Sequence, residues 1–165
     1  MNAQLLDVNA AIAGIERTLR RLVGETIELV MKLEPGAAPV MADVDAIEQM
    51  VLNLALDACD GMTRGGVLVV ETANVRLDDA DGAPAPGHAG SHVMIAVTDT
   101  GTGFGRAMIF GIVKRIGGQC RVRRQAGRGT QFCVYLPAQT GSPWRIGRPA
   151  TSTLPAALER RASVA

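Results

Sequence analysis

Apolar residues recur at steps of three and four along the first part of the chain, which is the spacing of one face of an α-helix. This first stripe consists of Val8, Ile12, Ile15, Leu19 and Leu22. Asp7 precedes the stripe as an N-cap and Gly24 follows it, so the pattern predicts an amphipathic helix over about residues 8–22. A strand is predicted next at 26–33, followed by a turn-rich segment at 34–39.

A second, longer stripe predicts the main helix of the chain, with Asp43 as its N-cap. Its apolar members are Val44, Ile47, Met50, Val51, Leu54, Ala55 and Ala58. Polar residues at similar spacing share another face of the same helix. They are Gln49, Asn53, Asp57 and Asp60. A polar face of this kind is usually solvated surface, and it points to a site only in combination with other motifs.

The rest of the chain predicts two hairpins and a third helix. Strands are expected at 67–74, from residue 92 or 93 to Asp99, at 119–125 and at 130–136, with a long loop at 76–92 and a helix at about 106–116. The order helix, strand, helix, hairpin, helix, hairpin predicts an α+β fold: a two-layer sandwich with a mixed, mostly antiparallel sheet and helices on one face. We expect residues 1–137 to form this domain and residues 138–165, which lose periodicity, to form a disordered tail.

Composition narrows the classes of function. The net charge is +1 and aromatic residues make up 3%, which gives no case for binding nucleic acid or an anionic membrane. No apolar run reaches membrane-spanning length and no signal peptide is evident, so we expect a cytoplasmic protein. Three widely spaced cysteines, Cys59, Cys120 and Cys133, predict buried free thiols and no metal cluster.

The candidate chemistry begins at Asp99, where a strand ends in the sequence Asp-Thr-Gly-Thr-Gly-Phe-Gly before a helix. Glycines at such a turn let backbone N–H groups approach an anion, and a helix N-terminus adds partial positive charge. Taken alone, the turn is as well explained by steric needs as by nucleotide binding. The polar face of the main helix and the Gly-Arg-Gly-Thr turn at 127–130 shift the balance toward a nucleotide site.

In this order the motifs resemble the ATP-binding domain of sensor histidine kinases, within the wider Bergerat-fold family that includes gyrase, Hsp90 and MutL. The resemblance covers about residues 5–137. Residues 42–62 are similar to the N box, 97–105 to the first glycine box, 110–118 to the helix after the second glycine box, and 127–137 to the closing Gly-Thr strand. The resemblance implies ATP and Mg²⁺ as cofactors.

The resemblance also implies roles for individual residues. Asp99 matches the aspartate that accepts a hydrogen bond from the adenine amino group. Gly101 and Gly103 match glycines that allow the base and sugar to lie close to the backbone. Thr130 matches the threonine that supports the adenine site, and Asn53 matches the first asparagine of the N box.

The sequence departs from the family on the phosphate side. Asp57 stands where the family has the asparagine that binds Mg²⁺; a carboxylate can hold this ion, and without the ion it repels phosphate. The two glycine boxes are fused, so that Gly103 and Gly105 serve both and the segment that closes over the phosphates is absent. Arg106 can replace some of the lost phosphate contacts, although an arginine exposed to solvent is the simpler interpretation.

The phosphoacceptor is missing as well. The helix predicted at 8–22 contains no histidine, and we interpret His88 and His92 as surface loop residues. A phosphoacceptor-histidine domain or a response regulator would then be a partner of the chain.

The leading hypothesis is therefore an ATP-binding domain of a two-component sensor histidine kinase, acting in a phosphorelay and degenerate in its lid and N box. The alternatives are a non-catalytic interaction or regulatory module and a relative of the anti-sigma serine kinases. No catalytic residue can be named, and we expect the isolated chain to be inactive.

Overall fold

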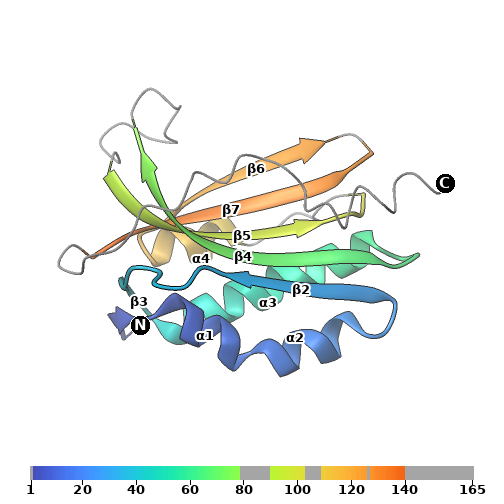
Figure 1. The fold of residues 1–165 in the computed structure, drawn as a ribbon, viewed down its shortest axis with the longest axis horizontal. Helices are drawn as coiled ribbons and strands as arrows, with labels where there is room; N and C mark the ends of the chain where they lie inside the picture. The colour runs from blue at the N-terminus through green and yellow to red at the C-terminus, as the bar shows by residue number, and fades with distance from the viewer. Residues whose placement is uncertain (1, 79–89, 103–108, 126, 140–165) are drawn as a thin grey trace.

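A computed structural model describes residues 2–78, 90–102, 109–125 and 127–139 of the chain (Figure 1). Its strands are β1 (Gln4–Leu6), β2 (Ile27–Leu33), β3 (Val40–Ala42), β4 (Gly66–Leu77), β5 (Gly90–Asp99), β6 (Gln119–Gln125) and β7 (Gly129–Pro137). Its helices are α1 (Val8–Gly14), α2 (Glu16–Val23), α3 (Val44–Gly61) and α4 (Ile109–Arg115).

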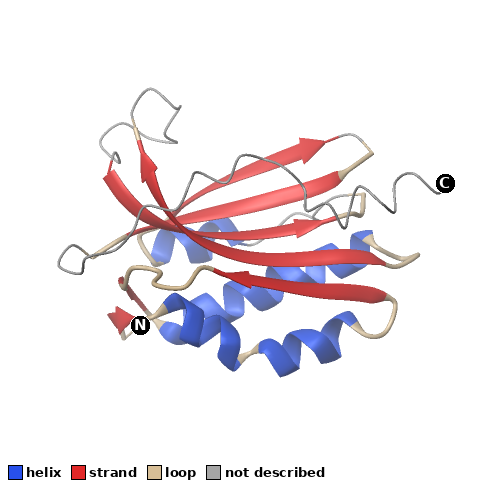
Figure 2. Ribbon diagram, in the orientation of Figure 1, coloured by secondary structure: helices blue, strands red, loops and turns tan. Residues whose placement is uncertain are grey.

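Five strands form one sheet in the order β2-β4-β5-β7-β6, and β1 pairs with β3 in a separate two-stranded ribbon. Within the sheet β2 and β4 are parallel, whereas all other neighbouring strands are antiparallel. The described helices lie on one side of the sheet (Figure 2). This arrangement confirms the predicted α+β sandwich with a mixed, mostly antiparallel sheet.

The predicted first helix is wrong in one respect, because it is divided into α1 and α2 at Ile15. Ile15 leaves helical geometry, and its N–H donates to the carbonyl of Ile12, three residues earlier, instead of four. Gly14, a poor helix former, precedes the break. Ile15 stays buried, so both helices still present the first stripe to the core. Asp7 caps α1 and Gly24 ends α2, both as predicted, and Gly24 has a positive φ.

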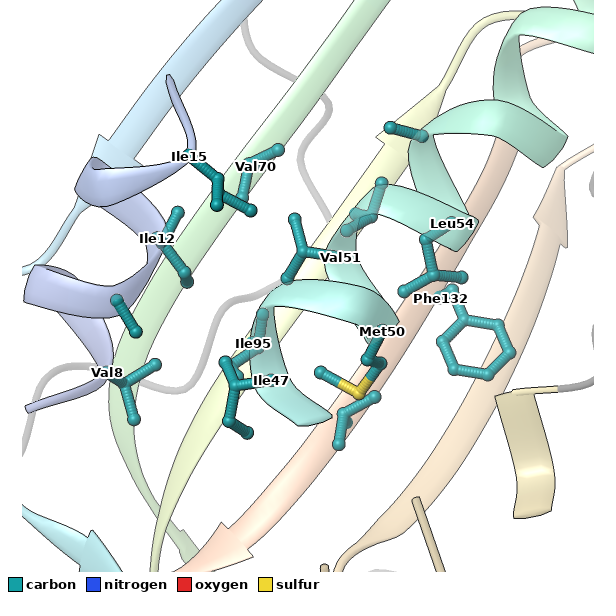
Figure 3. Packing of buried hydrophobic residues seen from close by; sticks show 14 of the residues in the cluster. Val8, Ile12, Ile15, Ile47, Met50, Val51, Leu54, Val70, Ile95 and Phe132 are labelled. Atoms are coloured by element: carbon teal, nitrogen blue, oxygen red, sulfur yellow. The ribbon is translucent and has the colours of Figure 1, made fainter. Parts of the chain in front are cut away.

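The helix α3 lies in the middle of the helical layer, between α1 and α2 on one side and α4 on the other, and packs on β5. Its side chains Ile47, Met50 and Leu54 have no exposed surface, and they belong to the main core with residues from β4, β5 and β7. Figure 3 shows these side chains of α3 directed toward Ile95 and Phe132 of the sheet. The predicted N-cap is confirmed, because the carboxylate of Asp43 accepts from the N–H of Asp45.

Two buried polar side chains of β4 fix the segment between β2 and β3. The Thr72 hydroxyl accepts from the N–H of Glu34 at 3.0 Å and donates to Oδ1 of Asn9 at 2.7 Å. The Asn74 side chain accepts from the N–H of Ala38 at 2.8 Å and donates to the carbonyl of Gly36 at 3.0 Å. These bonds tie α1 and the segment after β2 to the central sheet.

The buried threonines Thr72 and Thr98 provide a matched test of this network, since each is 4% exposed and they lie on adjacent strands. The Thr98 hydroxyl has no hydrogen-bond partner in the described structure. Thr72→Val should lower the free energy of unfolding by about 1 to 2 kcal/mol, because it leaves two partners unsatisfied. Thr98→Val should be neutral or stabilising. Equal losses in urea denaturation of the two variants would contradict this account.

Candidate functional site

The candidate site is built around Asp99, the last residue of β5. In the sheet register Asp99 lies between Leu68 of β4 and Thr130 of β7. Its side chain is 1% exposed, and Oδ1 accepts from the backbone N–H of Gly101 at 2.7 Å. The other oxygen, Oδ2, is buried and has no hydrogen-bond partner among the described residues.

The electrostatic setting of Asp99 follows from this burial. Burial raises the pKa of the carboxyl group, while the N–H of Gly101 and the positive charge of Arg124 act in the opposite direction. A buried acceptor without a donor is unfavourable, so Oδ2 favours any ligand that brings an N–H group to it. An aromatic amine such as that of adenine is a donor of this kind.

The turn after Asp99 packs directly against the C-terminal end of α3. A Cβ atom at Gly101 would overlap the carbonyl oxygen of Gly61 and lie 2.8 Å from Cγ of Met62. The N–H of Thr102 donates to the same carbonyl of Gly61 at 3.1 Å. Gly101 is therefore required for close contact between the turn and the helix, whatever else it does.

Two residues of this site were not singled out from the sequence. Thr100 accepts from the N–H of Val67 at 3.0 Å and so joins the turn to the start of β4. Gly129 has a φ of 105°, and a Cβ atom there would overlap the carbonyl oxygen of Asp99 and lie 2.8 Å from Cα of Thr100. The available signals were the Asp-Thr-Gly and Gly-Thr pairs, but only the pairing of β5 with β7 brings them into contact.

The polar face of α3 includes residues shortly before the point where this helix contacts the turn after Asp99. Asn53 and Asp57 are both half-buried, and they precede Gly61 by about 12 and 6 Å along the helix axis at 1.5 Å per residue. Burial, together with the nearby charge of Asp60, raises the pKa of the Asp57 carboxyl group. The helix thus carries an anionic position one turn before the point where it contacts Gly101.

A bound Mg²⁺ would depend on the nucleotide for most of its ligands. No group of three or more histidine, cysteine, aspartate or glutamate side chains within the described residues is arranged to hold a metal ion. Asp57 offers a hard carboxylate oxygen, which suits Mg²⁺ when phosphate oxygens and water supply the remaining ligands. The chemistry of this position therefore fits a nucleotide-bound cation.

Several predicted residues lie outside the described residues, namely Gly103, Gly105, Arg106 and His88. Most of the predicted tail at 138–165 does so too. The interpretation of His92 as a surface loop residue was wrong: His92 lies within β5, which begins earlier than predicted, and its side chain is buried. The prediction of free thiols is confirmed, with Cys133 buried and Cys59 and Cys120 half-buried.

The described helices include none long and apolar enough to cross a membrane.

Comparison with known proteins identifies the family. Residues 42–140 match the family described as histidine kinase-, DNA gyrase B-, and HSP90-like ATPase. The chain is 31% identical to sensor kinase CckA of Brucella abortus (strain 2308) over 83% of its own length and 17% of the relative. It is 32% identical to sensor histidine kinase ZraS of Escherichia coli (strain K12), over 81% of the chain and 31% of the relative. The chain thus spans less than a third of these curated relatives.

Solved structures show the same fold. The mycobacterial sensor histidine kinase MprB aligns with a TM-score of 0.60 and 22% identity, over 84% of this chain and 99% of that structure. Full-length ShkA in complex with AMPPNP aligns with a TM-score of 0.66 and 18% identity, over 88% of this chain and 33% of that structure. The chain belongs to the histidine kinase-, DNA gyrase B- and HSP90-like ATPase family, as an ATP-binding domain of the two-component sensor histidine kinase type.

Proposed function

We propose that the chain binds ATP through a pocket in which Asp99 recognises the adenine amino group, with Gly101 and Thr130 beside the base. The observation that carries this proposal is the buried Oδ2 of Asp99, which lacks a partner among the described residues while Oδ1 is held by Gly101. An exocyclic amine would supply the missing donor. The same position would reject guanine, which presents a carbonyl oxygen there.

The phosphate side of the proposed pocket consists of Asn53 and Asp57 on α3, with Gly103 and Gly105 after the Asp99 turn. Mg²⁺ bound to the triphosphate would be held in part by Asp57. Only residues 103–108 separate Thr102 from α4, which leaves little chain to cover the phosphates. Because phosphoryl transfer depends on positioning and on exclusion of water, we expect nucleotide binding without autophosphorylation by the isolated chain.

In the cell the proposal places this chain in the cytoplasm as part of a phosphorelay kinase, with a phosphoacceptor-histidine domain and a response regulator as partners. Calorimetric titration with a non-hydrolysable ATP analogue, with and without Mg²⁺, tests the binding step. The same titration with a GTP analogue is the matched control, and we expect binding of the adenine compound alone. Equal binding of the two, or of neither, would remove the proposed adenine site and leave an interaction module as the better interpretation.

The charge at Asp57 predicts how the metal should affect affinity. In the absence of Mg²⁺, Asp57→Asn should tighten nucleotide binding by roughly fivefold, or about 1 kcal/mol, because it removes a carboxylate that repels phosphate across a partly solvated distance. With Mg²⁺ the gain should shrink, since the cation neutralises the repulsion. Asp60→Asn on the exposed next turn should produce a smaller change. An unchanged affinity for Asp57→Asn in Mg²⁺-free calorimetry would place Asp57 away from the phosphates.

A further inference from the structure

Arg124, near the end of β6, lies in register with two residues of the proposed adenine site. In the sheet Asp99 of β5 is opposite Thr130 of β7, and Thr130 is opposite Arg124 of β6. Because neighbouring strands are about 4.8 Å apart, the backbone of Arg124 lies about 5 Å from that of Thr130 and about 10 Å from that of Asp99. These three residues form one row across the sheet, and an arginine side chain is long enough to extend beyond its neighbour in such a row.

The row faces the helices. Successive side chains of a strand alternate between its two faces, so residues two or four positions apart share a face. Val97 on β5 and Phe132 on β7, each two positions from the row, belong to the core under the helices. On β6, Cys120 packs against the same core and lies four positions before Arg124. All three side chains of the row are therefore directed to the helix side of the sheet.

The described helices leave the β6 end of this row accessible. Arg124 is exposed, and Val122 on the same face of β6 is 47% exposed. The ring of Phe110 on α4 meets the ring of Phe132 edge-on, with centroids 6.0 Å apart, and Phe110 is itself 58% exposed. Phe132 is opposite Val122, so this contact of α4 lies two residues along the strands from Arg124. The guanidinium group makes no hydrogen bond or ion pair with any described residue.

The charge of Arg124 already acts on the site. Burial raises the pKa of the Asp99 carboxyl group, and the N–H of Gly101 and the positive charge of Arg124 oppose that rise. The preceding residue, Arg123, is directed to the opposite face of the sheet, because neighbouring side chains of a strand alternate. Arg124 thus brings a cation with five N–H donors to the side of the row where the proposed base would bind.

The direction of a bound adenine follows from the position of the proposed phosphate side. Asn53 and Asp57 belong to α3, which packs on β5, whereas β7 and β6 continue the sheet beyond β5. The five-membered ring of adenine carries the ribose and phosphates, so it would point toward α3. The six-membered ring would then direct N1, a hydrogen-bond acceptor next to the amino group, toward β7 and β6.

We propose that Arg124 donates a hydrogen bond to N1 of the adenine ring, an inference that rests on the proposed function. Asp99 then accepts from the amino group while Arg124 donates to the adjacent ring nitrogen, so two atoms of the base are recognised. Guanine presents the reverse at both positions, a carbonyl oxygen and a ring N–H group, and Arg124 therefore opposes guanine in addition to Asp99. A contact with phosphate and an arginine that faces only solvent are the competing outcomes.

Base analogues combined with matched variants test this contact. The full chain is titrated in a calorimeter, with Mg²⁺, against ADP, 1-deaza-ADP, in which a C–H group replaces N1, and 7-deaza-ADP. The wild-type protein should bind ADP about tenfold more tightly than 1-deaza-ADP, the loss expected for a hydrogen bond from a charged donor at a partly solvated position. It should bind 7-deaza-ADP about as tightly as ADP.

The two adjacent arginines supply the variants. Arg124→Met keeps an unbranched side chain but removes every donor, so the preference for ADP over 1-deaza-ADP should fall to about twofold or less. Arg123→Met makes the same change on the opposite face of the same strand and should keep the wild-type preference. Arg124→Lys retains a charged donor and should keep part of the preference.

The pattern across the analogues separates this contact from other roles of Arg124. An equal weakening of ADP and 1-deaza-ADP in Arg124→Met would assign the side chain to phosphate or to the fold and overturn the proposal. An unchanged preference in Arg124→Met would overturn it as well, and so would a wild-type preference against 7-deaza-ADP that this variant removes. If the wild-type protein binds none of the three compounds, the proposed function itself is overturned, together with this contact.

Discussion

Replacing Asp99 with asparagine should weaken adenine-nucleotide binding by about ten- to a hundredfold, the loss expected when a hydrogen bond to a buried charged acceptor becomes a clash. An asparagine has a single side-chain oxygen. If that oxygen still accepts from the N–H of Gly101, the new amide nitrogen faces the adenine amine. If the side chain flips, the amide nitrogen faces the N–H of Gly101 instead. In either orientation two N–H donors face each other, so the loss of affinity follows from geometry as well as from charge.

The control for this variant is Asp78→Asn, which makes the same chemical change at an exposed position at the end of β4. Both variants should be compared by calorimetry with an ATP analogue after circular dichroism has shown that they are folded. Unchanged affinity in Asp99→Asn would contradict the proposed recognition of adenine.

The pH dependence of wild-type binding provides a second check on Asp99. Burial raises the pKa of this carboxyl group, so binding should weaken as the pH falls through that raised value and the group ceases to be an acceptor only. The stability of the free domain should respond in the opposite sense. A raised pKa in the folded state means that the contribution of Asp99 to stability is present at low pH and is lost as the pH rises through the folded value.

The parts of the fold that could be predicted from sequence are those encoded locally. The apolar stripe of α3 and its cap at Asp43 lie within a few residues of one another, and the structure confirms both. The same holds for the strand that ends at Asp99, whose turn follows at once. Short strands such as β1 and β3 escaped prediction because three residues are too few to show a period.

Other features depend on contacts between distant segments and left little trace in the sequence. The burial of His92 follows from the lengthening of β5 against β4 and β7, since its neighbours in the register are Val75 and Pro137. The requirement for glycine at Gly129 appears only when Asp99 and Thr130 are paired.

Recognition of the base and handling of the phosphates rest on different parts of the structure. Asp99 and Thr130 are buried at neighbouring positions of central strands, so the proposed adenine side is rigidly held by the sheet. Asn53 and Asp57 are half-buried on one helix face. A domain built in this way can lose elements needed for phosphoryl transfer while its adenine site stays intact, because the sheet does not depend on them.

Gly129→Ala should destabilise the domain by about 3 to 4 kcal/mol, combining an unfavourable positive φ with a steric overlap against the backbone of Asp99. The φ of Gly129 is 105°, and an added methyl group would overlap the carbonyl oxygen of Asp99 and lie 2.8 Å from its carbonyl carbon. The obstructing atoms belong to the backbone, so no side-chain rotation can relieve the contact. The backbone of Asp99 must then move away from β7, and nucleotide binding should fall together with stability.

Gly127→Ala is the matched control two residues earlier in the same turn. Its φ of 75° is also positive, but nothing lies within 4 Å of an added Cβ, so the expected loss is about 1 kcal/mol from backbone strain alone. The difference between the two free energies of unfolding in urea therefore isolates the contact with Asp99. Equal losses would show that backbone strain alone explains the glycines. A Gly129→Ala variant that unfolds early yet binds nucleotide with normal affinity when folded would mean that the position of the Asp99 backbone does not determine adenine recognition.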